Sequence, residues 1–288
     1  MIRTEGLVKH YRVIEHRHGR LAAVRDLLAP QARTVQALRG VTLEIRPGEL
    51  VGVIGRNGAG KSTLIKVLTG LLVPTAGSVE TLGLVPSRSR RQLAYRIGVL
   101  FGQRTQLWWD LPVLDSLRLH QTMYGISEER FGTSLRLLDE LLELGPLLNK
   151  AVRQLSLGQR ARANLALCLL HEPELIFLDE PTIGLDVLVK DRIRTFLRRI
   201  NQERGTSVVL TSHDMADVEE VCERIVVIDA GQVLFDGSLE AIKRQYIRER
   251  LVKVTLSRPA VLPEWPGIRQ VGVEGTERPI HTLAFRPE

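Results

Sequence analysis

The sequence predicts an α/β fold: a mixed sheet covered by helices, an inserted all-helical subdomain and a small C-terminal β-containing appendage. Short apolar runs that do not alternate with polar residues are typical of strands buried on both faces of a sheet. Such runs occur at Leu50–Ile54, Ile97–Phe101, Leu175–Leu178, Ser207–Thr211 and Ile225–Ile228. Helical patterns separate them; in Val187–Ile200, for example, the apolar residues recur at helical spacing. This alternation indicates the α/β class.

A leucine-rich region interrupts the alternation. From about residue 111 to residue 155 there is no strand pattern, only helical stretches such as Leu135–Leu144. We therefore expect a helical subdomain at about residues 104–158, inserted into a main domain of residues 1–238.

The alternation stops again after Leu239. A basic helical stretch, Ile242–Arg250, comes first. Alternating apolar residues follow at Val252, Val254 and Leu256. A Pro/Gly-rich region then leads to a final strand-like segment at residues 281–285. We expect residues 239–288 to form a small C-terminal extension that contains β-strands.

The N-terminal region gives few structural signals. Residues 13–36 are predicted to be a long polar, basic connection before a short strand at Val41–Ile45, and we assign them no role. The first twelve residues have no apolar run behind their charges, so they are not typical of a secretory signal. No stretch reaches the roughly 18 apolar residues that a membrane helix requires. If this protein acts at a membrane, we therefore expect it to do so through a partner protein.

Composition and charge narrow the class of partner. The 288 residues are 44% hydrophobic and 25% charged, which is ordinary for a globular protein, and the net charge is +7. That charge suits a nucleotide, a nucleic acid or an anionic membrane surface, and composition does not rank these. Cys168 and Cys222 lie in apolar helical patterns without metal-site spacing, which favours core positions in a reducing compartment.

The strongest signal is a glycine-rich loop at residues 55–62. It fits G-x-x-x-x-G-K-[ST] at every fixed position, follows a predicted strand and opens a helical stretch, Ser62–Leu71. Glycines let the backbone wrap around phosphate oxygens with its N–H groups pointing inward. We expect Lys61 to reach the β- and γ-phosphates and Ser62 to offer its hydroxyl to Mg²⁺. The predicted nucleotide-binding residues of this region are Gly55, Arg56, Asn57, Gly58, Ala59, Gly60, Lys61, Ser62 and Thr63.

Two carboxylates follow the apolar strand at residues 175–178. A strand end beside the phosphate loop is a suitable place for a Mg²⁺ ligand, so we assign that role to Asp179. Glu180 comes next and can accept a proton from an attacking water. Together with the phosphate loop, this pair predicts a phosphate-loop NTPase. The guanine-reading motif Asn-Lys-x-Asp is not formed at Asn149-Lys150, which is followed by Ala151-Val152, so adenine is favoured.

Three further elements resemble those of the ATP-binding cassette (ABC) family. Leu155-Ser156-Leu157-Gly158-Gln159 precedes a helical run at Arg160–Leu170 and is similar to the family's signature sequence, usually Leu-Ser-Gly-Gly-Gln. Gln103 follows a predicted strand, as the family's Q-loop glutamine does, and His213 resembles its switch histidine. The order of these elements carries more weight than any one of them, since a lone histidine after a strand is more often a satisfied polar residue.

Two weaker elements complete the resemblance, which covers roughly Arg3 to Gly237. Ile183-Gly184-Leu185-Asp186 resembles the family's D-loop. Tyr11 lies where the family places an aromatic ring against adenine, although a lone tyrosine is more often a packing residue.

The resemblance implies an ATPase that uses ATP and Mg²⁺ and works as a head-to-tail pair. Each subunit would cap its partner's ATP with Ser156, Gly158 and Gln159. Glu180 would polarise the attacking water, Lys61 and His213 would stabilise the γ-phosphate, and Gln103 would sense the γ-phosphate or the metal. The implied metal ligands are Ser62, Gln103 and Asp179.

Leu157 departs from the family pattern, because it replaces the first signature glycine. Leucine would be strained if that position required a positive φ. We therefore expect Leu157 to adopt an ordinary conformation, while the Ser156 hydroxyl and the Gly158 amide contact the γ-phosphate.

A finer resemblance lies in Phe101–Asp110 and in the signature sequence. Both are similar to bacterial sodium-exporter-like and viologen-exporter-like cassettes, which implies export. In the family, the region after the Q-loop faces the membrane subunit, so Trp108 and Trp109 are candidate interface anchors. Packing within the helical insert is an equally good explanation for both residues.

The resemblance implies permease subunits and a second ATPase subunit, expected to be identical, as partners. The expected location is the cytoplasmic face of a bacterial cell membrane. A single-cassette ATPase that acts on nucleic acid or on the ribosome is the main alternative. The sequence has one cassette, no sustained heptads and no cysteine clusters, so we expect no nucleic-acid partner. A phosphate-loop kinase is the second alternative, and the signature and switch-histidine elements argue against it.

Overall fold

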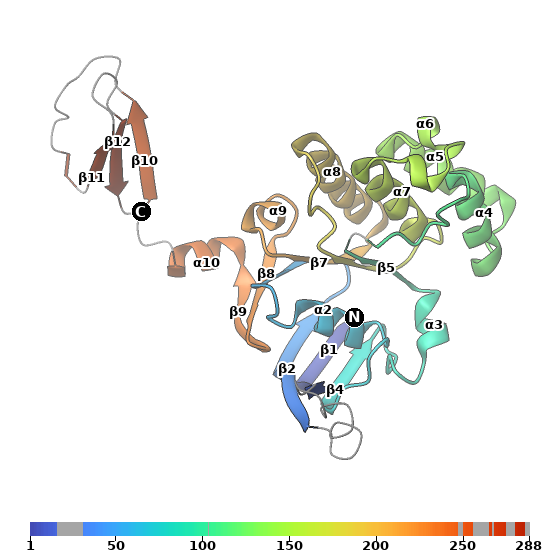
Figure 1. Cartoon of the computed structure of the whole chain (residues 1–288), viewed down its shortest axis with the longest axis horizontal. Coiled ribbons are helices and arrows are strands. Elements are labelled where there is room, and N and C mark those ends of the chain that lie inside the picture. The colour runs from blue at the N-terminus through green and yellow to red at the C-terminus, as the bar shows by residue number, and fades with distance from the viewer. Residues whose placement is uncertain are drawn as a thin grey trace, which may run out of the picture. The chain divides into compact units, whose positions relative to one another are not determined.

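The fold is taken from a computed structural model that describes residues 1–15, 31–102, 104–246, 250–255, 265–266, 268–274 and 280–285. The chain divides into two compact units, Met1–Asp236 and Gly237–Glu288 (Figure 1). No helix among these residues is both long enough and apolar enough to cross a membrane.

A six-stranded sheet forms the centre of the first unit, in the order β5-β6-β7-β3-β8-β9. Its strands are β3 (Leu50–Ile54), β5 (Ile97–Phe101), β6 (Leu175–Asp179), β7 (Ser207–Ser212), β8 (Arg224–Asp229) and β9 (Gln232–Ser238). The pairs β5–β6, β6–β7, β7–β3 and β3–β8 are parallel. Because a two-residue connection between β8 and β9 requires an antiparallel pair, the sheet is mixed. The predicted α/β class is confirmed, and the predicted apolar strands agree to within one residue at each end.

A second sheet, in the order β2-β1-β4, lies beside the first. Its strands are β1 (Ile2–Glu15), β2 (Gln31–Ile45) and β4 (Ala76–Thr81). The helix α2 (Lys61–Leu68) contacts strands of both sheets. Buried side chains of this helix, including Leu64 and Leu68, join those of both sheets in one apolar core. The helix α2 is therefore packed against both sheets.

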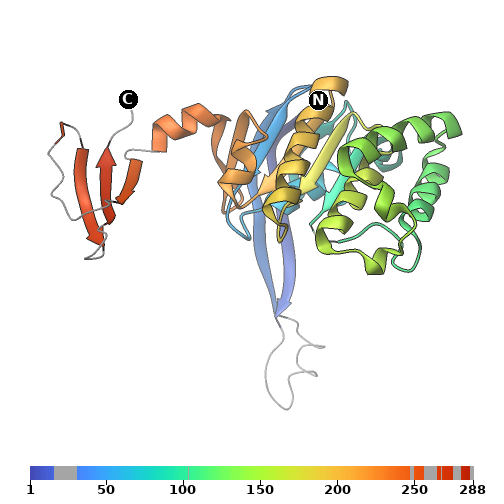
Figure 2. The same cartoon turned by 90° about the horizontal axis from the view of Figure 1, so that it is seen from above.

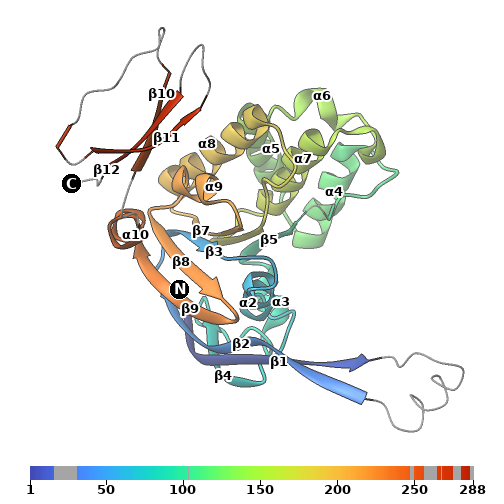
Figure 3. The same ribbon diagram turned by 60° about the vertical axis from the view of Figure 1, so that its left-hand side comes forward.

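The prediction of a connection at residues 13–36 is wrong at both of its ends. Val13 pairs with Arg33 and Tyr11 pairs with Val35, so β1 and β2 form a long antiparallel ribbon that extends past β4 (Figures 2 and 3). Residues 16–30 lie outside the described part of the chain. Val13 and Val35 are exposed, so the ribbon is held by backbone pairing and leaves no apolar pattern in the sequence.

A group of helices begins within the predicted insert at residues 104–158, and the last of them extends beyond it to residue 169. These are α4 (Val113–Tyr124), α5 (Glu128–Leu142), α6 (Gly145–Leu148), the 3₁₀ turn Val152–Gln154 and α7 (Leu157–Leu169). The helix α7 packs against α4 and α5. Its start is three residues before the predicted Arg160. Shorter helices elsewhere in the first unit are α3 (Arg90–Ala94) and α9 (Met215–Glu219), and α8 (Val187–Arg204) is longer than its predicted range.

The second unit contains a helix and a small sheet. The helix α10 (Leu239–Tyr246) is followed by a sheet of order β10-β12-β11, with β10 (Arg250–Thr255), β11 (Ile268–Glu274) and β12 (Ile280–Phe285). The predicted β-containing appendage is confirmed. The expected helix was too long, because Arg250 begins a strand, and Leu256 lies outside the described residues.

Candidate active site

The phosphate loop connects β3 to α2, and its glycines are required by close backbone contacts. A Cβ atom on Gly55 would lie 2.2 Å from the carbonyl oxygen of Ile228. Gly60 has φ +111°, and its Cβ would lie 2.6 Å from the carbonyl oxygen of Ala37. A larger residue at either position would therefore push the loop away from the neighbouring strands β8 and β2.

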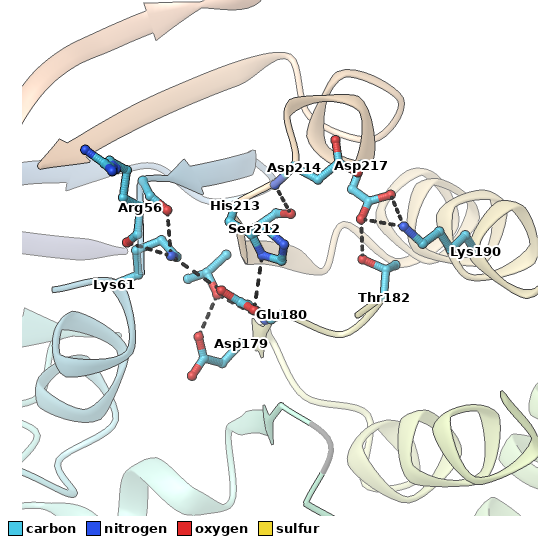
Figure 4. Close-up of polar contacts among 12 residues, drawn as sticks. Arg56, Lys61, Asp179, Glu180, Thr182, Lys190, Ser212, His213, Asp214 and Asp217 are labelled. Carbon is cyan, nitrogen blue, oxygen red and sulfur yellow. Dashed lines mark hydrogen bonds and ion pairs between the residues drawn. The ribbon is translucent and has the colours of Figure 1, made fainter. Parts of the chain in front are cut away.

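Lys61 is the first residue of α2, directly after the loop, and is only 5% exposed. Its ammonium group donates to the carbonyl oxygens of Gly55 at 2.7 Å and of Arg56 at 3.3 Å. It also lies 3.4 Å from Glu180 Oε1 (Figure 4). The loop backbone thus aims this cation at the end of β6.

Glu180 has a strained backbone, with φ +51°. A non-glycine residue in this region costs about 1–3 kcal/mol and persists where surrounding contacts enforce it. Here the Glu180 amide donates to Thr211 Oγ1 at 3.1 Å, and the Thr211 hydroxyl donates to Asp179 Oδ1 at 2.6 Å. Sequence reasoning missed Thr211, because a threonine at the end of a buried strand carries no motif.

His213 completes a cluster of three polar side chains. Its Nδ1 lies 3.3 Å from Glu180 Oε2, and its side chain is 45% exposed. The switch position after β7, the strand end of β6 and the start of α2 therefore bring His213, Glu180 and Lys61 together (Figure 4). A carboxylate between a lysine and a histidine is suited to proton transfer beside a phosphate.

The residues expected to hold Mg²⁺ line one pocket. Ser62 and Asp179 both face a pocket of about 540 Å³ at the end of the phosphate loop. A hydroxyl and a carboxylate are the oxygen donors that Mg²⁺ takes from proteins when substrate phosphates supply further ligands. The donor set therefore fits the ion. Gln103, the third expected ligand, lies outside the described residues.

Tyr11 lies beside the phosphate loop. Its hydroxyl is 3.4 Å from Thr63 Oγ1, and its ring is partly buried. The structure thus brings Tyr11 from β1 and Thr63 from α2 to the same place. Arg56, Asn57 and Gly58 form the exposed tip of the loop, whereas Ala59 is buried.

The signature residues form the first turn of α7. Ser156 is the N-cap: its Oγ accepts from the Gln159 amide at 3.3 Å, and its own amide donates to Gln159 Oε1 at 3.0 Å. Leu157 does not have a positive φ, so the expectation of an ordinary conformation is confirmed. A Cβ on Gly158 would lie 3.1 Å from Val189 Cγ2, which explains a small residue there. In the described part of the chain, the Ser156 and Gln159 side chains bond to this turn and not to the phosphate loop.

The two tryptophans after the Q-loop are both exposed. The Trp108 amide donates to Ser116 Oγ at 3.1 Å, and the Arg160 guanidinium lies 4.6 Å from the centre of the Trp109 ring. The backbone of this segment is therefore fixed to the helical insert while large parts of both rings face outward.

An apolar pocket of about 300 Å³ lies between the helical insert and the sheet. His120, Tyr124 and His171 line it, and the Tyr124 ring stacks 4.2 Å from both histidine rings. Burial, with a smaller effect of His171, lowers the pKa of His120 to about 4, so His120 is uncharged at neutral pH, and burial also lowers the pKa of His171. The wall therefore favours an apolar contact.

Together, these features define a phosphate-loop ATPase of the ATP-binding cassette class. The sequence pattern of the family described as "ABC transporter" matches residues 38–183, and the chain belongs to this family. It binds ATP with Mg²⁺ and is an ATPase subunit of transporters.

Known proteins with similar sequences and structures fit this class. NatA of Bacillus subtilis, an ABC transporter ATP-binding protein, is 31% identical over 78% of this chain and 92% of NatA. The methionine import ATP-binding protein MetN of Latilactobacillus sakei is 36% identical over 77% of this chain and 65% of MetN. The dimeric ATP-binding cassette MJ0796, in a post-hydrolysis state with ADP and Pi, matches with a TM-score of 0.69 at 27% identity, covering 83% of this chain and 99% of MJ0796.

Proposed function

We propose that this chain powers export through separate permease subunits, as one half of a head-to-tail pair of identical ATPase subunits on the cytoplasmic face of a bacterial membrane. The observation that carries the proposal is the cluster of Lys61, Glu180 and His213 on one chain, with the signature residues bonded within their own helix. A second copy would supply the missing half of each site.

The chemistry follows from the positions of these groups. Glu180 accepts a proton from the water that attacks the γ-phosphate in line. Lys61 neutralises negative charge on the phosphate oxygens, and His213 holds the γ-phosphate and the water in place. Mg²⁺, held by Ser62 and Asp179, supplies further charge neutralisation when bound. Gln103 is assigned the role of sensing the γ-phosphate.

Exposed apolar residues beside the D-loop support the pairing of two copies. Val187 is 76% exposed and Leu188 is 81% exposed, and both directly follow Asp186 at the start of α8. Adjacent exposed apolar side chains are typical of protein contacts. MJ0796, which shares the fold of this chain, is a dimer.

The permease is proposed to contact the helical insert near Trp108 and Trp109. Their exposure argues against a role limited to packing. Gln106 lines the apolar pocket beside His120 and belongs to the segment that carries the two tryptophans. One partner can therefore contact both the pocket and the tryptophans.

Export rests on the resemblance of residues 101–110 and of the signature sequence to exporter-like cassettes. The names of relatives do not decide the direction, because the MetN relatives are named for import. NatA, the relative that this chain covers almost completely, is named without a direction.

Co-purification from membranes, followed by transport in inverted vesicles, tests the proposal. We expect permease chains to co-purify and a cargo to move with ATP from the outer, cytoplasmic face into the vesicle lumen. Movement out of the lumen would contradict export. An ATPase activity that nucleic acid stimulates and salt steeply reduces, with no permease chain bound, would contradict the transport assignment.

A further inference from the structure

A buried carboxylate near the active site has no role in the chemistry described above. Asp217 belongs to α9, the short helix that follows His213, and its side chain is 4% exposed. Its Oδ2 accepts from the Thr182 hydroxyl at 2.7 Å and lies 3.3 Å from the Lys190 ammonium group (Figure 4). Its Oδ1 forms an ion pair with Arg194.

These contacts keep Asp217 charged. Burial alone raises the pKa of the carboxyl, but the hydrogen bonds from Thr182, Arg194 and Lys190 outweigh burial, so the pKa lies below its usual value. A buried charge is tolerated only when it is paired in this way. Removal of the carboxylate would therefore leave two cations without a partner at the base of α9.

The three partners come from segments that surround the proposed reaction centre. Thr182 is two residues after Glu180 and directly precedes the D-loop residue Ile183. Lys190 and Arg194 lie on α8, which begins directly after the D-loop. Asp217, on the helix that follows His213, thus links α9 to the segment after Glu180 and to α8.

We propose that Asp217 is a positioning residue. It keeps His213 beside Glu180 by linking α9 to Thr182 and to α8. The proposal rests on the roles of Glu180 and His213 given above. The helix α9 has only five residues and is held by the buried Val218 and by these polar contacts of Asp217. A displaced His213 would slow the chemical step and change ATP binding little, because the phosphate loop, which supplies most of the proposed phosphate contacts, lies on other elements.

The chain offers a matched control in Glu172. This carboxylate also accepts from one hydroxyl, Ser134 at 2.7 Å, and pairs with two cations, Arg130 at 2.7 Å and Arg204 at 3.5 Å. It joins α5 and α8 at a place that has no part in the proposed site. Glu172→Gln therefore removes a carboxylate with a similar set of partners, although one that is 32% exposed, without touching α9.

The test compares kcat and KM for ATP in Asp217→Asn, Thr182→Val and Glu172→Gln. Small displacements of catalytic groups are costly, so we expect Asp217→Asn to lower kcat about tenfold with KM unchanged. Thr182→Val keeps both ion pairs and should lower kcat by a smaller factor, which preserves the test if Asp217→Asn does not fold. Glu172→Gln should keep kcat within about twofold of the wild-type value, even if its thermal stability falls as much as that of Asp217→Asn.

A double-mutant cycle with His213→Ala separates positioning from general damage. If Asp217 acts through His213, Asp217→Asn should have little further effect on the residual single-turnover rate of His213→Ala. An equal loss in both backgrounds, or an unchanged kcat in both Asp217→Asn and Thr182→Val, would overturn the proposal. Glu180→Gln is measured alongside: if it is inactive while those two variants keep the wild-type kcat, positioning fails and the proposed function stands, whereas wild-type turnover of Glu180→Gln removes the basis of both.

Discussion

The α/β core and the helical insert each carry one loop that is proposed to contact phosphate, but the side chains of the two loops are arranged differently. In the core, charged groups meet within one chain: Lys61 lies 3.4 Å from Glu180, which lies 3.3 Å from His213. In the insert, Ser156 and Gln159 bond to each other at the start of α7. The core therefore holds the proposed hydrolysis centre, whereas the insert presents a capped helix start.

A capped helix start is a good partner for phosphate. The N-terminus of a helix has a partial positive charge and unpaired amide groups, and the cap fixes their direction. In the proposed arrangement, one chain therefore supplies two unlike halves of a site, and a second copy would bring them together.

The largest expected effect is on the core. Glu180→Gln removes the proposed proton acceptor and keeps the size of the side chain, so ATP hydrolysis should fall by about 10²–10⁴-fold. ATP should then hold two copies together, which gel filtration with ATP would detect. Glu174→Gln, at an ion pair with Arg96 elsewhere in the core, is the control. Turnover at the wild-type rate in Glu180→Gln would contradict the role of this residue.

The next effect is on the insert. Ser156→Ala removes the proposed γ-phosphate contact, and loss of one such donor costs about 10²-fold in turnover. It also removes a helix cap, worth about 1 kcal/mol of the free energy of unfolding. Ser127→Ala is the matched control, because Ser127 caps α5 through the Arg130 amide. Nearly unchanged ATPase kinetics in Ser156→Ala would count against the signature assignment.

A third prediction tests whether the insert also serves the permease. Replacing Trp108 and Trp109 by alanine should weaken permease binding by at least about 30-fold, the factor for loss of one buried aromatic anchor. ATP binding should be unchanged, because neither ring contacts the phosphate loop residues in the described structure. Pull-down of the permease and a nucleotide-binding assay measure the two effects. Unimpaired assembly of the complex would assign both residues to packing.

The smallest effect concerns the surface that joins the two halves. Leu188→Glu places a charge at the start of α8, so the ATP-bound pair formed by Glu180→Gln should be about tenfold weaker. Met123→Glu changes a similarly exposed apolar residue on α4 and should leave pairing intact. Sedimentation across a concentration series compares them. Equal dimer affinity in both variants would exclude α8 from the contact.

The core was easier to predict from the sequence than the insert for a physical reason. The phosphate loop and the strand end at Asp179 depend on neighbouring residues, so their patterns are local. The start of α7 was placed three residues late, although Ser156 and Gln159 have the spacing of a capping box. Ser156 and Gln159 are therefore a local sequence signal for the start of this helix.

Other features left no local pattern. The part of the β1–β2 ribbon that extends past β4 is held by backbone pairing between largely exposed residues, so hydrophobic periodicity does not reveal it. The contacts of Thr211 with Asp179 and of Asp217 with Thr182 join residues 32 and 35 positions apart. Only the sheet order brings these residues together.

The central claim is that two copies complete each site, and crosslinking tests it directly. Asn57→Cys is at the exposed tip of the phosphate loop and Ser156→Cys is in the signature, here in the Glu180→Gln background. Burial raises the pKa of the native Cys168 and Cys222 thiols to about 12, so these should react slowly. With both substitutions and Mg-ATP, oxidation should give a covalent dimer that neither substitution gives alone. Absence of that dimer, while an otherwise unsubstituted Glu180→Gln protein pairs normally, would contradict the head-to-tail arrangement.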